Sequence, residues 1–215
     1  MTPNKEDYLK CIHELGQIQL KISNKMIAEK MQVSPPAVSE MLKKMINQEW
    51  IQKDTKKGYL LTDKGSDLVA NLYRKHRLIE VFLINQLGYS PQEVHQEAEI
   101  LEHTVSNTFI DRLDENLGFP TFCPHGGTIP RKNEPLKEIN HQTLSQLSSP
   151  GTYKLARIHD HIELINYLEQ HDLRLNTLID LQQIDNFAKT YTISYNNKSL
   201  TIPEIIAEQL YISEA

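Results

Sequence analysis

Apolar residues in the first 50 positions recur with the period of an amphipathic helix, and they predict three consecutive helices. The first helix is expected to begin at the N-cap Thr2, with Pro3 at its first position, and to end at Gly16. The second is expected to be capped by Ser23, and the third by Ser34. Along the third helix, the residues predicted to point inward are Val38, Met41, Leu42, Met45 and Ile46.

After these helices the pattern changes to two short strands, residues 51–53 and 59–61, on either side of the turn DTKKG. A long helix is expected over residues 63–87. Two helices joined by a short turn and followed by a hairpin have the order of a winged helix-turn-helix, which binds DNA. The alternative for this segment is a bundle of helices whose lysines are simply solvated.

The start of the third helix and the tip of the hairpin carry the side chains that would contact DNA. Lysines contact phosphates without reading the sequence, whereas small groups at the start of a recognition helix approach bases and thymine methyl groups. The candidates for phosphate contacts are Lys43, Lys44, Lys56 and Lys57. The candidates for base contacts are Ser34, Pro36, Ala37 and Ser39.

The stretch HQEAEILEH follows the capping box SPQE and presents polar side chains on one helical face about 100° wide. These side chains are His95, Glu99, Glu102 and His103. In the preceding long helix His76 and Glu80 are also one turn apart. A single His/Glu pair is usually a surface ion pair, but two pairs in adjacent helices next to a DNA-binding module favour a divalent cation site. Imidazole and carboxylate donors suit Mn²⁺ or Fe²⁺, and Zn²⁺ or Ni²⁺ can substitute in vitro.

Charge divides the chain in the same way as the motifs. The formal charge of −5 is the sum of +5 in residues 1–77 and −10 in residues 78–215. The basic first part fits an anionic partner such as DNA, and the acidic second part fits either cations or an ordinary solvated surface.

Length and composition exclude several classes of protein. A chain of 215 residues holds one to three small domains. It has no apolar run of about 18 residues and its N-terminus is charged, so neither a membrane span nor a signal peptide is expected and a cytoplasmic location is predicted. Cys11 and Cys123 form no CxxC motif, which argues against a disulfide framework or a zinc ribbon.

The last 70 residues or so are rich in β-forming residues and predict a small β-barrel. The expected strands lie in YKLARI, LRLNTLIDLQQI, TYTISY and KSLTI, with a helix in HIELINYLEQ and a last helical turn in PEIIAEQL. The aromatic residues of this part are scattered, which argues against a groove for proline-rich peptides.

Five motifs together give the chain a family resemblance: SPPAVSEMLKKM, LTDKG, YRKHRLIE, EAEILEH and FPTFCPHGGTIP. With them it resembles the diphtheria-toxin-repressor/MntR family of metal-dependent transcriptional repressors, in the three-domain, manganese-responsive branch. The resemblance implies a mainly α fold with a small β part. It implies a winged helix-turn-helix domain in residues 1–72, a helical dimerisation and metal-binding domain in 73–140, and an SH3-like, FeoA-type barrel in 148–215.

The resemblance also implies two metal sites. The primary site would be formed by Asp7, His76, Glu99, Glu102 and His103. The ancillary site would be formed by Glu80, Cys123, His125 and Asp160. His95 belongs to the ancillary site in other family members, and its membership here is left open because Cys123 and His125 offer a replacement.

The resulting hypothesis is a homodimeric repressor that binds palindromic operator DNA when Mn²⁺, or else Fe²⁺, is bound, and that controls metal-uptake genes. The alternative is a metalloenzyme built on the helical His/carboxylate site. An enzyme would need an open coordination position and a substrate pocket. No nucleophile, phosphate loop or acid/base pair in the sequence supports that alternative, so the chain is predicted not to be an enzyme.

Overall fold

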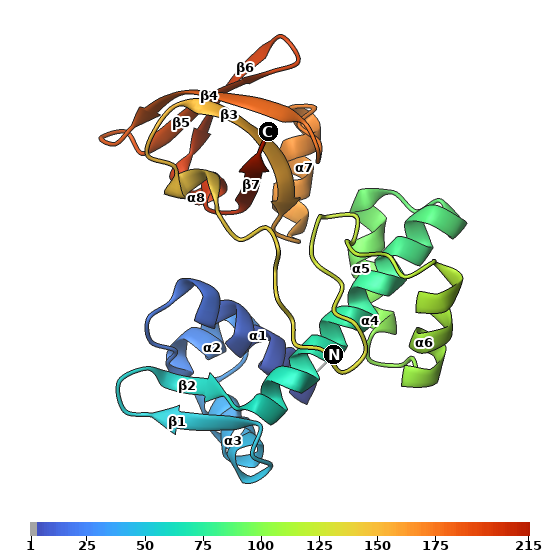
Figure 1. Ribbon diagram of the computed structural model, residues 1–215. Helices are drawn as coiled ribbons and strands as arrows, with labels where there is room; N and C mark the ends of the chain where they lie inside the picture. Colours follow the sequence, from blue (N-terminus) through green and yellow to red (C-terminus); the bar gives the residue numbers. More distant parts are fainter. Residues whose placement is uncertain (1–3) are drawn as a thin grey trace. The chain divides into compact units, whose positions relative to one another are not determined.

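The structure is a computed structural model that describes residues 4–215 and divides the chain into two compact units (Figure 1). The first unit contains the chain up to Lys75 together with Pro130–Leu136, and the second contains His76–Ile129 and Lys137–Ala215. The boundary falls inside the long helix α4 (Asp63–Leu87), which has the bounds expected from the sequence. Within residues 4–215, no helix is both long and apolar enough to cross a membrane.

The first unit has the order of elements of a winged helix-turn-helix. Its elements are α1 (Lys5–Ile18), α2 (Asn24–Met31), α3 (Pro35–Asn47), β1 (Ile51–Asp54) and β2 (Gly58–Leu61). The two strands pair antiparallel, with Ile51 opposite Leu61. Fully buried side chains of its core include Leu9, Ile12, Ile27, Leu42 and Met45. Thus the inward faces of the three helices meet in one core, as their apolar periodicity predicted. The exception is Ile46 at the end of α3, which was expected to point inward but is 37% exposed.

Serine caps begin two of these helices as predicted. The Ser23 hydroxyl accepts a hydrogen bond from the Met26 amide, and the Ser34 hydroxyl accepts one from the Ala37 amide. The expected end of the first helix at Gly16 is wrong. The helix continues to Ile18 because the Gln19 amide donates to the Leu15 carbonyl at 2.9 Å.

The expected start of this first helix is only partly covered by the structure. Asn4 is the N-cap of α1, and it forms a capping box with Asp7. Thr2 and Pro3, which were expected at this position, lie outside the described residues.

The helical part of the second unit consists of the end of α4, α5 (Pro91–Leu101) and α6 (Asn107–Asn116). Ser90 and Glu93 form the predicted capping box of α5. This helix ends at Leu101, so Glu102 is its C-cap and His103 lies in the following turn. The polar face expected over residues 95–103 is therefore only partly helical. The backbone of the turn sets the directions of the Glu102 and His103 side chains.

The rest of the second unit is built around a five-stranded antiparallel sheet of order β6-β5-β4-β3-β7. Its strands are β3 (Gly151–Ile158), β4 (Leu178–Asp185), β5 (Thr190–Tyr195), β6 (Lys198–Pro203) and β7 (Leu210–Glu214). A short 3-10 helix, η1 (Leu144–Gln146), precedes the sheet, and α8 (Glu204–Ala207) is the expected last helical turn. Strand β7 was not expected; it pairs with β3, with Leu155 opposite Ile212.

Helix α7 (Ile162–Gln170) lies beside this sheet in Figure 1 and packs on it through Leu164 and Leu168, which belong to the same core as Leu155 and Ile193. Residues 4–215 are therefore mainly helical, with the β1–β2 hairpin and one small sheet as their β parts, as predicted.

Candidate metal centre

Side chains from four separate segments of the second unit meet in a buried cluster of imidazoles and carboxylates. His76 and Glu80 lie one turn apart on α4, and their side chains are 4% and 0% exposed. His95 comes from α5. The remaining members are Asp160, which follows β3, and two side chains of the loop 120–129, which we call the Cys123 loop.

His76, His95 and Asp160 approach one another around Glu80. His76 Nε2 lies 3.2 Å from Glu80 Oε1 and 3.2 Å from Asp160 Oδ2. The other oxygen of Asp160, Oδ1, lies 3.1 Å from His95 Nδ1. Thus one imidazole nitrogen faces two carboxylates, and the second carboxylate bridges to another imidazole.

The Cys123 loop reaches the same carboxylates from another direction. His125 Nδ1 lies 3.1 Å from Glu80 Oε1 and 3.4 Å from Asp160 Oδ1. The Cys123 thiol, Glu80 and His125 have ligand atoms within 4.8 Å of one another. Because Glu80 and Asp160 are shared, the side chains of α4, α5, the Cys123 loop and the segment after β3 form one continuous cluster.

Gly126 lets the Cys123 loop lie against β3. It has a φ of +79°, and a Cβ there would come within 2.2 Å of the Ala156 carbonyl oxygen. The neighbouring His125 carbonyl accepts a hydrogen bond from the Ile158 amide at 3.0 Å. The glycine in the sequence CPHGG therefore sets the position of His125 relative to β3.

A second group of side chains lies next to Nδ1, the other ring nitrogen of His76. His76 Nδ1 is 2.5 Å from Glu102 Oε2, and His103 Nε2 is 3.3 Å from Glu102 Oε1. Glu99 Oε1 lies 3.5 Å from His95 Nε2, and its side chain is 51% exposed. Of the predicted primary set, His76, Glu102 and His103 are thus adjacent, while Glu99 is directed toward His95.

Asp7 belongs to the first unit and takes part in its local structure. Its carboxylate accepts a hydrogen bond from the Asn4 amide at 2.7 Å, which completes the capping box of α1. Its assignment as a metal ligand stays a prediction from the family resemblance.

The charges of the cluster depend on one another. Burial and the Asp160 charge raise the pKa of Glu80, but the His76 and His125 rings outweigh them and hold it below its ordinary value. Burial also raises the pKa of Asp160, yet the surrounding imidazoles hold it well below its usual range. Burial lowers the pKa of His125, but the Cys123 thiol and the carboxylates of Glu80 and Asp160 outweigh burial and raise it to about 11. The buried carboxylates are thus ionised and depend on nearby positive charge.

The distances between ligand atoms in the cluster fit a bound cation. An ion that binds nitrogen and oxygen at about 2.0–2.2 Å holds neighbouring ligand atoms about 3.0–3.5 Å apart. The separations around Glu80 and Asp160 fall in this range. Within residues 4–215, Glu80 Oε2 and both ring nitrogens of His125 are buried without a hydrogen bond of good geometry. Buried polar atoms that lack such partners are costly, and a cation would satisfy them.

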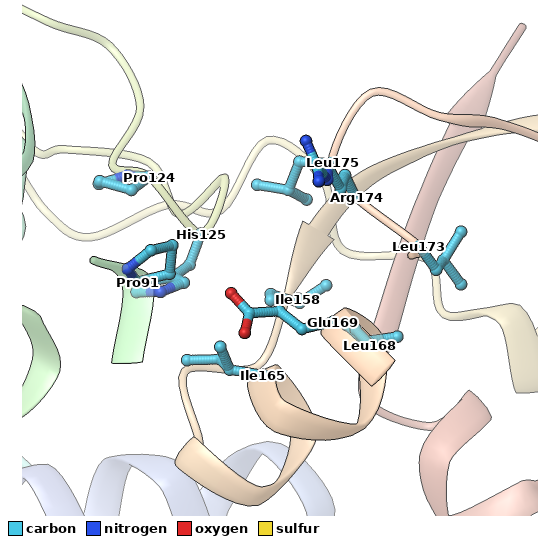
Figure 2. Close-up of a pocket in the computed structure, with 10 residues that line it drawn as sticks. All are labelled: Pro91, Pro124, His125, Ile158, Ile165, Leu168, Glu169, Leu173, Arg174 and Leu175. Atoms are coloured by element: carbon cyan, nitrogen blue, oxygen red, sulfur yellow. The ribbon is translucent and has the colours of Figure 1, made fainter. Parts of the chain in front are cut away.

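A cavity of 690 Å³ reaches this cluster at His125 (Figure 2). Pro91, Pro124 and His125 lie on one side of it, and residues of α7, such as Ile165 and Glu169, lie on the other. A metal site needs an entry path, and this cavity offers one from solvent to the imidazole of His125.

The predicted DNA-contacting residues lie on the surface of the first unit. Ser34 is the N-cap of α3, and its neighbours Pro36, Ala37 and Ser39 are exposed at the start of that helix. The Ser39 hydroxyl accepts a hydrogen bond from the Asn24 side chain at 2.8 Å, which links α2 to α3. The exposed lysines are Lys43 and Lys44 on α3, and Lys56 and Lys57 at the turn between β1 and β2.

Models of three protein-family domains match successive parts of the chain. Residues 1–59 match the N-terminal DNA-binding domain of the iron-dependent repressors, and residues 62–131 match their metal-binding and dimerisation domain. Residues 142–214 match the FeoA domain. The chain belongs to the iron-dependent repressor family. It is accordingly a metal-dependent, DNA-binding transcriptional regulator, and the alternative of a metalloenzyme is excluded.

Relatives of this repressor cover its full length. The iron-dependent repressor IdeR of Mycobacterium tuberculosis is 27% identical, with 100% of this chain and 98% of IdeR aligned. The crystal structure of the metal-dependent transcriptional regulator MtsR is 68% identical, with a TM-score of 0.90 and 100% of both chains covered. The structure of the manganese regulator SloR is 52% identical, with a TM-score of 0.92 and 100% of both chains covered.

His95 is the residue of this repressor that sequence reasoning left undecided. In the structure it lies beside Asp160 and forms an edge contact with His76, at 5.2 Å between ring centroids. The i, i+4 spacing of His95 and Glu99 signalled a polar face. It did not identify Asp160, 65 positions later, as the nearer carboxylate to His95 Nδ1.

Proposed function

We propose that this repressor is activated by Mn²⁺ and, as a homodimer, binds palindromic operator DNA of metal-uptake genes in the cytoplasm. The observation that supports the proposal most strongly is the buried cluster around Glu80. Two ionised carboxylates, three imidazoles and one thiol converge there, and all of them except Asp160 lie in the part of the chain that matches the family's metal-binding domain. Such donors are placed in a protein interior at a cost, which metal binding would offset.

The donor types support manganese as the metal. Oxygen and imidazole ligands suit Mn²⁺ and Fe²⁺, and a single thiolate among many oxygen and nitrogen donors does not make a soft-metal site. SloR, which shares 52% identity over the whole chain, is a manganese regulator. Zn²⁺ or Ni²⁺ would bind in vitro as well, because both stand higher in the Irving–Williams order.

We assign the ligands to two sites, following the family resemblance. The primary site takes Asp7, His76, Glu99, Glu102 and His103. The ancillary site takes Glu80, Cys123, His125 and Asp160. The distance of 3.1 Å between His95 and Asp160 supports adding His95 to the ancillary site. The short contacts of His76 with Glu80 and with Glu102 place this imidazole next to both sites.

Exposed apolar side chains support the dimer. Ile100, Phe109, Phe119 and Phe122 are between 41% and 57% exposed, and all lie in the part that matches the metal-binding and dimerisation domain. Several large apolar side chains on one domain are typical of a surface that another chain covers. A two-fold dimer presents two recognition helices and therefore requires a palindromic operator with half-sites about one turn of DNA apart.

The decisive experiment measures binding of the protein to a palindromic operator duplex in chelator and in Mn²⁺. We expect metal to raise operator affinity about tenfold to a hundredfold, a coupling of about 1.4–2.8 kcal/mol. By reciprocity, operator DNA should tighten Mn²⁺ binding by the same factor. Equal operator affinity in chelator and in Mn²⁺ would refute metal activation, and stronger activation by Fe²⁺ at matched free concentration would reassign the metal.

A further inference from the structure

Next to the metal centre, a second buried cluster joins three segments of the second unit through one carboxylate. Glu138 Oε1 lies 2.6 Å from Arg77 Nη2 and 3.3 Å from Arg157 Nη1. The three side chains are 18%, 9% and 12% exposed in that order, so all are largely shielded from water. Arg77 lies on α4 and Arg157 on β3, while Glu138 lies in the segment that leads toward the FeoA domain.

The same carboxylate and Arg77 also bind the backbone of the Cys123 loop. Glu138 Oε2 accepts a hydrogen bond from the Thr128 amide at 2.9 Å, and Arg77 Nη1 donates to the Thr128 carbonyl. The Ile139 amide donates to the Thr128 hydroxyl at 3.1 Å. Gly127 allows this approach, because a Cβ at that position would lie only 2.6 Å from Arg77 Cζ. Thr128, at the end of the loop, is therefore held through its backbone amide, its backbone carbonyl and its side-chain hydroxyl.

Each segment that meets at Glu138 also carries candidate metal ligands. Arg77 follows His76 directly on α4, and Thr128 lies three residues after His125. Arg157 lies three residues before Asp160 and is itself held by Tyr211, with Arg157 Cζ 3.4 Å from the centre of the tyrosine ring. Through Arg77, Thr128 and Arg157, Glu138 contacts residues that lie one to three positions from candidate ligands.

We infer that Glu138 is a positioning residue for the ancillary metal site, holding the Cys123 loop and the end of β3 so that Cys123, His125 and Asp160 converge on Glu80. This inference rests on the ancillary site of the proposed function. It adds that the affinity of that site for metal is set by an ion cluster outside the coordination sphere. Groups that hold metal ligands in place typically change metal affinity 10–100-fold when they are replaced.

Glu138 needs its negative charge as well as its shape to hold Arg77 and Arg157. Burial raises the pKa of Glu138, but the charges of Arg77 and Arg157 and the Thr128 amide outweigh burial and hold it below its ordinary value. A glutamine at this position would keep the size of the side chain and one acceptor oxygen. It would leave two buried guanidinium groups facing an amide without negative charge, and the segments that they hold would separate.

The test uses Co²⁺ as a probe in the full-length protein, because a thiolate bound to Co²⁺ gives a charge-transfer absorption that identifies Cys123 as a ligand. We expect Glu138→Gln to need about tenfold more Co²⁺, or more, to reach half of this absorption. The exposed Glu134→Gln, in the connection between α6 and β3, is the matched control and should titrate as the wild type does. Cys123→Ser should abolish the absorption, which assigns it to this thiol and not to Cys11.

A second variant keeps the test decisive if Glu138→Gln fails to fold by circular dichroism. Gly127→Ala leaves all charges in place and displaces the Arg77 guanidinium, so it should weaken the same absorption in the same direction. If the folded variants of both positions titrate as the wild type does, Glu138 has no positioning role. If the wild type itself shows no thiolate absorption, Cys123 is not a ligand, and the ancillary site of the proposed function fails together with this inference.

Discussion

At the scale of single residues, two glutamates near the end of α5 meet very different surroundings. The Glu102 side chain is 1% exposed and lies between the rings of His76 and His103. The Glu99 side chain is 51% exposed, and its Oε1 lies 3.5 Å from His95 Nε2. A carboxylate that is already buried between imidazoles needs little rearrangement to bind a cation, whereas an exposed one must first leave solvent.

We therefore expect Glu102→Ala to reduce Mn²⁺ affinity at least tenfold, about 1.4 kcal/mol or more, and Glu99→Ala to reduce it less. Isothermal titration with Mn²⁺ on both variants measures the two losses. Exposed Gln96→Ala on the same helix should behave as the wild type. Unchanged affinity in Glu102→Ala would contradict the assignment of this residue as a ligand, and a larger loss in Glu99→Ala would reverse the ranking.

The protonation of His125 gives a second prediction for a single residue. Its pKa of about 11 means that the imidazole carries a proton at pH 7, and a cation that binds at Nδ1 must displace that proton. Metal binding should therefore release protons, and Mn²⁺ affinity should fall as the pH is lowered from 8 to 6. Titrations in two buffers of different ionisation enthalpy count the protons released. A His125→Gln variant should release fewer protons than the wild type, and an equal number would rule out His125 as their source.

At the scale of elements, the hairpin of β1 and β2 is built to present lysines. The Lys56 and Lys57 amides both donate to Asp54 Oδ1, each at 2.7 Å, and these bonds lower the pKa of Asp54. The turn is thus fixed by the Asp54 side chain and the two lysine amides, and both lysine side chains remain exposed. An ordered, exposed and basic turn is suited to phosphate contacts, which need charge at a defined place and no sequence information.

Replacing Lys56 and Lys57 together by alanine should weaken binding to operator and to unrelated DNA alike. Because each phosphate contact contributes about 0.9 to the slope of log affinity against log salt, the slope should fall by up to about 1.8. Fluorescence anisotropy over a salt series measures both effects. Pro36→Ala at the start of α3 is the contrasting variant and should mainly reduce discrimination between operator and mutated operator. An altered sequence preference with an unchanged slope in the lysine variant would contradict a phosphate-binding wing.

At the scale of the whole molecule, the regulator must transmit metal binding from one unit to the other. The primary site proposed by resemblance has one member, Asp7, in the DNA-binding unit, while His76, Glu99, Glu102 and His103 belong to the second unit. A ligand set with members in both units would convert metal occupancy into a restriction on the recognition helices. A two-fold dimer needs those helices about 34 Å apart to read two half-sites together.

Asp7→Asn tests this role without removing the helix cap, since the amide oxygen can still accept the Asn4 hydrogen bond that Asp7 accepts at 2.7 Å. We expect a folded dimer that binds Mn²⁺ more weakly and that gains less than about threefold in operator affinity at saturating metal, against tenfold to a hundredfold in the wild type. Operator binding and metal titration on the same variant measure both quantities. Wild-type operator affinity in the saturated variant would show that metal acts through other contacts.

Much of the fold follows from local signals in the sequence. Ser23, Ser34 and the Ser90/Glu93 box begin their helices in the structure as their positions predicted. The bounds of α4 were also expected, because caps, turn residues and apolar periods act within a few positions of the chain. The hairpin that precedes α4 was expected as well, and each of its strands is one residue longer than predicted. The exceptions are equally local. At Gly16 a glycine is tolerated inside α1, and after Leu101 the helix gives way to a turn.

The sequence by itself determined which kinds of side chain are available: a basic module with capped helices, and imidazoles and carboxylates spaced by single helical turns. Only the tertiary structure decided which of them meet. His95 lies beside Asp160, and Glu80 is shared between His76 and His125, because α5, the Cys123 loop and the end of β3 pack together. Glu138 joins Arg77 to Arg157 across 80 positions of the chain. Such meetings depend on packing and on strand register between distant segments, and a local period or cap carries no information about either.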